Sequence, residues 1–244
     1  MKFLPLVTGE FTKIPRILLL FCTAIFALIP VLVSLIVYKQ GYDTFAAQGL
    51  ANSSGLLLYY HFVNNYCVVI LSAFLWFFIY SKENSYNTWS LLLTKIPYTV
   101  SIIGAKSIVF IVYYVISVII AYGSLLIVCL MQGISVEFRT IFSSLLISLL
   151  ITISIGFLQF IFHTIIRNGL IASSISIVWI ILLFLYNNFP YAVQLLFPLF
   201  LSTTAIELSN LKDMFTIIFF AIGSGLFIVV TVLLSAKKQL FQTD

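Results

Sequence analysis

The sequence predicts an all-α polytopic membrane protein with six transmembrane helices and both termini in the cytoplasm. Of its 244 residues, 62% are hydrophobic and 8% are charged, whereas soluble domains carry about 25% charged residues. Six apolar stretches lack Asp, Glu, Lys and Arg, and most approach the roughly 20 residues that cross a bilayer. The basic residues between these stretches gather on alternate connections, as the connections of a membrane protein do.

The six stretches occupy almost the whole chain, which we interpret as one transmembrane domain over residues 1–244. They are residues 17–37, 56–80, 107–130, 141–162, 169–185 and 215–235. The fifth is short. The first is too long for the core of a signal peptide and is not followed by a small-residue cleavage site, so we interpret it as a membrane anchor.

The basic residues set the orientation. Nine fall at the termini and in the second and fourth connections, and three fall in the remaining connections. The nine are Lys2, Lys13, Arg16, Lys82, Lys95, Lys106, Arg167, Lys237 and Lys238, and the three are Lys39, Arg139 and Lys212. Because the richer side faces the cytoplasm, both termini are expected inside.

Residues 189–206 are apolar but contain Pro190 and Pro198. Proline removes a hydrogen bond from a helix interior. A seventh span here would also move the basic C-terminus to the outer face. We therefore expect a broken, re-entrant or interfacial pair of short helices on the outer side, covered by other parts of the protein.

Residues 1–16 contain the pattern of an amphipathic helix. Helical spacing brings one apolar face together and leaves polar and basic residues roughly opposite. The apolar face is Phe3, Val7, Phe11 and Ile14, and the opposite residues are Thr8, Thr12, Lys13 and Arg16. This predicts a helix in the inner membrane interface, with its cations near anionic lipid head groups. The alternative is an ordinary basic flank before a first span.

The connection between the second and third stretches is long enough for a cytoplasmic helix. Tyr86, Trp89, Leu93 and Ile96 fall on one face at helical spacing. An exposed aromatic side chain on such a helix suits docking to a soluble partner. A helix that merely rests on the membrane is the alternative.

This segment resembles the permease subunits of type-2 ABC exporters. That family shows a glutamate after the second span, then Gly-Thr-Leu, a Leu-Leu pair, a proline and a lysine. The matching residues here are Glu83, Asn87-Thr88-Trp89, Leu92-Leu93, Pro97 and Lys106. Asn87 and Trp89 depart from the pattern, as does Thr99-Val100 where Ser-Arg is frequent. Glu10-Phe11-Thr12-Lys13, before the first span, is similar to the family's opening.

The resemblance implies a coupling helix over residues 83–97 that docks on an ATP-binding subunit. Its contact residues would be Glu83, Tyr86, Thr88, Trp89, Leu93 and Pro97. It also implies a second permease subunit, identical or related, and an outer re-entrant segment at 189–206. Size and N-terminal pattern are most similar to lantibiotic or bacteriocin immunity permeases, which implies an amphipathic antimicrobial peptide as substrate.

Several classes of chemistry have no signature in the chain. Gly-Lys never occurs, so there is no phosphate-binding loop, and the chain is expected to be a non-enzymatic subunit without a cofactor. The scattered cations argue against a nucleic-acid partner, and uncharged spans disfavour ion coupling. His61 and His163 are expected to be structural, near opposite interfaces. Export of a lipid, drug or other peptide, a membrane scaffold, and a lipid-modifying enzyme remain as alternatives.

Overall fold

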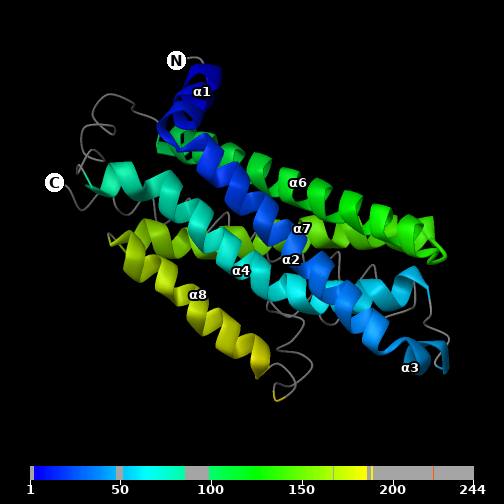
Figure 1. Cartoon of the computed structure of the whole chain (residues 1–244). Helices are drawn as coiled ribbons and strands as arrows, with labels where there is room; N and C mark the ends of the chain where they lie inside the picture. Colours follow the sequence, from blue (N-terminus) through cyan, green and yellow to red (C-terminus); the bar gives the residue numbers. More distant parts are fainter. Residues whose placement is uncertain are drawn as a thin grey trace.

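The computed structural model describes residues 3–47, 52–85, 99–166 and 168–185, together with Asn188 and Ile222. Within this part of the chain the regular elements are all α-helices, and no strand occurs. The helices are α1 (Phe3–Lys13), α2 (Arg16–Gln40), α3 (Tyr42–Ala47), α4 (Ser53–Ser85), α6 (Thr99–Gln132), α7 (Phe138–Ile165) and α8 (Gly169–Phe184), as drawn in Figure 1.

Four of these helices, α2, α4, α6 and α7, are long and apolar enough to cross a membrane. They contain the first four predicted stretches, so the prediction of an all-helical membrane protein is confirmed to that extent. Each helix is longer than predicted; α6, for example, begins eight residues before the expected start at residue 107. The fifth stretch forms α8, with 16 residues. Residues 189–206 and, apart from Ile222, residues 215–235 lie outside the described residues.

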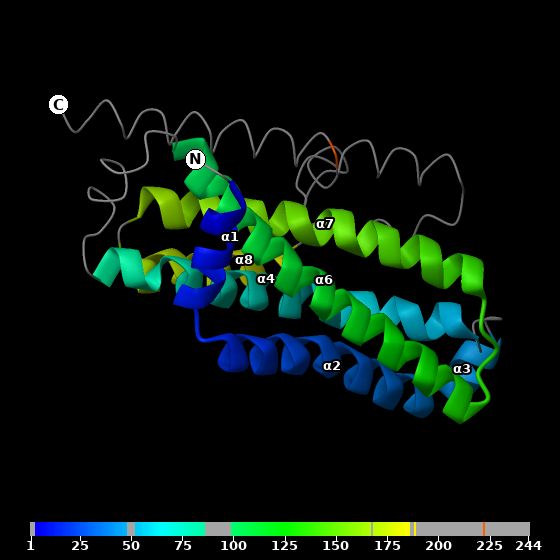
Figure 2. The same ribbon diagram turned by 90° about the horizontal axis from the view of Figure 1, so that it is seen from above.

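The long helices form a bundle around α4, which packs against α2, α7 and α8. Helix α6 packs against α2 and α7, and Figure 2 shows α2 and α7 on opposite sides of α4 and α6. In the first halves of α4 and α7, His61 contacts Ser144, and in their second halves Trp76 contacts Gly156. The two helices therefore run parallel. We refer to the end of the bundle that carries α1 as the α1 end.

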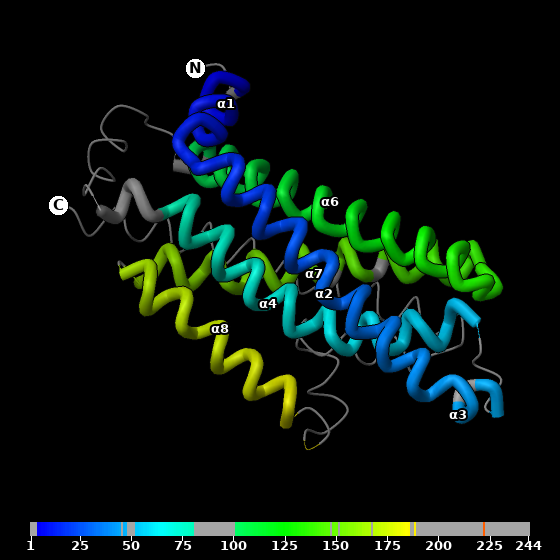
Figure 3. Tube along the Cα trace, in the orientation of Figure 1, coloured from blue at the N-terminus to red at the C-terminus, as the bar shows by residue number. Residues whose placement is uncertain are grey.

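The helix is interrupted between α1 and α2, at Ile14 and Pro15. Figure 3 shows that α1 runs in a different direction from α2, and α1 packs across the first turns of α6. Val7 and Ile14, on the predicted apolar face, are buried, and the ring of Phe11 lies 6.3 Å from that of Tyr113. Much of the apolar face is thus used for packing inside the protein. Thr8, Thr12 and Arg16, expected on the polar face, are exposed, and the side chain of Phe3 lies outside the described part.

An aromatic core fills the bundle near the α1 end. The buried Trp76 ring stacks on Phe110 at 4.7 Å between centroids and lies 4.5 Å from Phe160. Its indole N–H donates to the carbonyl of Gly156 at 2.7 Å. A Cβ atom at position 156 would overlap the ring of Phe110. Glycine at position 156 therefore lets α6 and α7 approach each other closely, and its carbonyl accepts the hydrogen bond from Trp76 of α4.

At the opposite end, the start of α4 is tied to the α6–α7 connection. The Ser53 amide donates to the carbonyl of Ser135 at 3.1 Å. The Glu137 carboxylate accepts from the Asn52 amide at 2.8 Å and from the Ser54 hydroxyl at 3.3 Å. These bonds fix the position of α4 along its axis relative to α7. The polar side chains of the two helices that are described below therefore lie opposite each other.

Candidate functional site

A buried lysine marks the α1 end of the bundle. The sequence predicts Lys106 in the connection before the third span, but in the structure the residue lies within α6, with none of its side chain exposed. Its ammonium group lies 2.7 Å from the Glu10 carboxylate and 3.4 Å from the Ile79 carbonyl. It also lies 5.2 Å from the centroid of the Tyr80 ring. Lys106 thus connects α6 with α1 and α4.

Glu10, the partner of Lys106, belongs to the buried face of α1 and is only 5% exposed. It also accepts a hydrogen bond from Lys13 at 2.6 Å. Burial by itself raises the pKa of Glu10, but the Coulombic attraction of Lys106 and the hydrogen bonds from both lysines outweigh it, so the pKa lies below its ordinary value of 4.5. The carboxylate is therefore ionised at neutral pH. We call Glu10, Lys13 and Lys106 the charge cluster.

Tyr80 links the charge cluster to α7. Its ring stacks on the imidazole of His163, with centroids 6.3 Å apart and planes at 15°. His163 is 2% exposed, and neither ring nitrogen has a hydrogen-bond partner among the described residues. The sequence predicts a histidine satisfied by water or a carbonyl near an interface, and no carbonyl of the described residues bonds to it. One turn earlier, the Gln159 amide donates to the carbonyl of Ala172 at 2.8 Å and joins α7 to α8.

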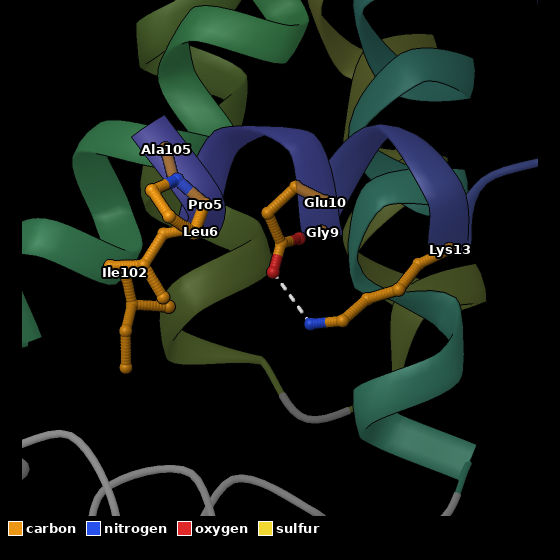
Figure 4. A pocket seen from close by; sticks show the side chains of 7 residues that line it. All are labelled: Pro5, Leu6, Gly9, Glu10, Lys13, Ile102 and Ala105. Carbon is orange, nitrogen blue, oxygen red and sulfur yellow. Dashed lines mark hydrogen bonds and ion pairs between the residues drawn. The ribbon is translucent and has the colours of Figure 1, made fainter. Parts of the chain in front are cut away.

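A cavity of about 160 Å³ lies between α1 and α6 beside the charge cluster. Its lining is apolar except for the carboxylate of Glu10 and the ammonium of Lys13, which Figure 4 shows bonded to each other. The lining residues are Pro5, Leu6, Gly9, Glu10, Lys13, Ile102 and Ala105.

The charge cluster stands where the predicted coupling segment joins the bundle. Tyr80 precedes Glu83 by three residues, and Lys106 follows Pro97 by nine. The backbone of Glu83 belongs to the last turn of α4. Its side chain lies outside the described part, as do Tyr86, Thr88, Trp89, Leu93 and Pro97, so the coupling helix over residues 83–97 stays a prediction.

A second polar group lies at the opposite end of the bundle. The Nε2 atom of the buried His61 shares a hydrogen bond with the hydroxyl of Ser144. The Tyr122 hydroxyl lies 2.9 Å from Ser144 Oγ and 2.8 Å from Ser148 Oγ. The group joins α4, α6 and α7. His61 and His163 are thus far apart, and the described residues contain no set of three side chains suited to a metal ion.

The two polar groups differ in what they can do. The charge cluster holds an ionised carboxylate between two ammonium groups, an arrangement that fixes helices rather than one that activates a nucleophile. Sequence reasoning missed the pairing, although one signal was present: Glu10 follows Val7 by three residues and precedes Ile14 by four, on the buried face.

No family model, curated protein or solved structure matches the chain.

Proposed function

We propose that the chain is the membrane-spanning permease subunit of an ATP-driven exporter of the type-2 ABC class. One observation carries the proposal. The predicted coupling segment begins at the end of α4 and ends at the start of α6, and these two helix ends meet α1 at the buried charge cluster. A force applied to the segment would therefore act on three helices that are joined to one another.

The joined helices are suited to transmit a displacement. Helix α4 has 33 residues, which corresponds to about 50 Å of length. Near the α1 end its Trp76 ring packs against the rings of Phe110 and Phe160. Close packing makes such a unit move as a rigid body instead of deforming locally. Docking of an ATP-binding subunit on residues 83–97 would tilt α4 and α6 together.

Energy would come from the partner, because the sequence has no phosphate-binding loop. Two permease subunits, identical or related, would pair in the membrane, and each would rest on an ATP-binding subunit. The substrate class that the family resemblance favours is an amphipathic antimicrobial peptide, expelled from the membrane as an immunity function. Export of a lipid, a drug or another peptide uses the same machinery and differs only in substrate.

Co-purification with a matched variant tests the proposal. The full chain, carrying an affinity tag, is isolated from its native membrane, and the eluate is assayed for an ATP-binding protein and for ATP hydrolysis. Trp89→Ala should remove both, because a buried aromatic dominates an interface of this kind. Phe142→Ala is the control, since Phe142 is an exposed aromatic on α7 near the opposite end.

The outcomes separate the candidate functions. An ATP-binding partner that is lost with Trp89→Ala and kept with Phe142→Ala supports the exporter. A chain that purifies without such a partner, or a partner indifferent to Trp89, overturns it and leaves the membrane scaffold. Activity of the isolated chain on a lipid without nucleotide would instead favour a lipid-modifying enzyme. Peptide, lipid and drug substrates are then compared by protection of cells that express the intact complex.

A further inference from the structure

The cavity between α1 and α6 combines apolar walls with a cation at its edge. Leu6 and Pro5 line it from α1, and Ile102 and Ala105 line it from α6 (Figure 4). A space of roughly 150 Å³ accepts small apolar molecules, and this one is partly open, so that a longer molecule can extend out of it. The cavity of about 160 Å³ is therefore large enough for part of a hydrocarbon chain.

The charges beside the cavity favour a negatively charged partner. Lys13 is 37% exposed at the lining. Arg16, the exposed first residue of α2, folds back to the end of α1, where its Nε donates to the Phe11 carbonyl at 2.9 Å. The carboxylate of Glu10 does not cancel this attraction fully, because it is held at 2.7 Å by the buried Lys106. Lys13 can thus turn towards another anion while Glu10 keeps its bond to α6.

We propose that this cavity binds an anionic phospholipid, with part of an acyl chain between α1 and α6 and the phosphate at Lys13 and Arg16. The location fits, because an amphipathic helix at a membrane interface lies at the depth where head groups meet acyl chains. Charge complementarity selects an anionic lipid over a zwitterionic one. The site is independent of the exporter proposal, since it needs only the membrane and the contact between α1 and α6.

A glycine at the cavity offers a clean way to fill it. Gly9 lines the cavity, and a Cβ atom built on it meets nothing within 4 Å. Gly9→Leu therefore adds a side chain at the cavity wall whose Cβ has room, and replacing a helical glycine favours the helix. Gly123 on α6 is the matched control, because a Cβ there also meets open space and the residue is remote from the cavity.

Photolabelling of the full chain in lipid nanodiscs tests the site. The discs contain phosphatidylcholine and a small fraction of phosphatidylglycerol that carries a diazirine on its acyl chain, and adducts are located by tandem mass spectrometry. We expect adducts on the cavity residues of α1 and α6. Unlabelled phosphatidylglycerol should compete for these adducts far better than unlabelled phosphatidylcholine. Adducts on the exposed residues Ile177 and Val178 of α8 should respond equally to both lipids.

The variants decide the outcome. Gly9→Leu should lower the cavity adducts about tenfold, the change expected when roughly two methylene groups lose their burial. Gly123→Leu should leave them unchanged, and Lys13→Gln should remove the preference for phosphatidylglycerol. Cavity adducts that survive Gly9→Leu overturn the proposal, and so does equal competition by the two lipids. Neither result tests the proposed ATP-binding partner, because that proposal is tested separately by co-purification.

Discussion

The Lys106 ammonium and the Glu10 carboxylate, 2.7 Å apart, join residues separated by 96 positions in the chain. Pro15 interrupts the path from α1 into α2, so α1 is held mainly by α6 rather than by its neighbour in sequence. The pair is shielded from water, since Lys106 exposes none of its side chain and Glu10 exposes 5%. Removing one member of the pair should therefore lower the stability of the folded protein strongly.

Removing one partner of this pair should destabilise the protein strongly. Glu10→Leu leaves the fully buried Lys106 without its carboxylate, which costs about 3–5 kcal/mol. Lys106→Met should cost less, because Glu10 keeps its bond to Lys13 at 2.6 Å. The double variant should cost much less than the sum, because no charge is then stranded. Lys13→Gln, which changes a partly exposed partner, should cost about 0–1 kcal/mol. Thermal unfolding in detergent measures all four variants, and additive effects of the two buried partners would contradict the prediction.

The pair should also make stability depend on acidity. Lys106 and Lys13 hold the pKa of Glu10 below its ordinary value of 4.5. The contribution of the ionised carboxylate is therefore complete above pH 4.5 and is lost as the pH falls through the lowered pKa. The unfolding temperature of the wild type should fall in this acid range by more than that of Glu10→Gln. Parallel pH profiles would show that Glu10 does not titrate as described.

Gly156 should be indispensable to the aromatic core. In Gly156→Ala the new methyl group meets the ring of Phe110, and overpacking of this kind costs about 1–3 kcal/mol. Phe110→Leu in the same chain should recover part of that loss by making room. Gly123→Ala, where the methyl group meets open space, should be neutral or stabilising. The unfolding temperature reports each change, and an unaffected Gly156→Ala protein would argue against the packing.

The polar group at the opposite end should contribute modestly. Ser144→Ala removes the hydrogen-bond partner of His61 and one partner of Tyr122, and such bonds between membrane helices average about 0.6 kcal/mol. Ser143→Ala is the control, because that hydroxyl bonds only locally, to the Thr140 carbonyl at 3.0 Å. A larger loss for Ser143 than for Ser144 would contradict the assignment. Unfolding in detergent again provides the measurement.

Cysteine labelling tests the predicted orientation. Cys22, Cys67 and Cys129 are first replaced, since all are free thiols. Thr12→Cys, on the exposed face of α1, should then react with an impermeant maleimide only from the cytoplasmic side. Gln132→Cys, exposed at the end of α6, should react only from outside. Labelling of both positions from the same side would refute the arrangement of spans.

Much of the fold could be predicted because its determinants are local. The positions of four long helices follow from runs of apolar residues, and the buried face of α1 follows from the spacing of Val7 and Ile14. The apolar pattern predicts that this face rests in the membrane interface, whereas in the structure α6 covers much of it.

The candidate site could not be predicted because its determinants are distant in sequence. The sequence predicts Lys106 in a connection between spans, since the apolar run begins directly after it. Only the packing of α1 across α6 shows that Glu10 neutralises the charge of Lys106. This pairing allows α6 to begin before residue 107, where the sequence predicts its start. The bond between His61 and Ser144 likewise joins residues 83 positions apart, and no periodicity reports such a pairing.

The parallel course of α4 and α7 has a consequence for biosynthesis. The indole N–H of Trp76 finds its acceptor 80 residues later in the chain. At roughly 5–20 residues per second, a ribosome needs about 4–16 s to make those residues. During that interval the nascent α4 has left the ribosome while its polar groups still await α7. The insertion machinery, a neighbouring helix or trapped water must shelter them until the later helix arrives.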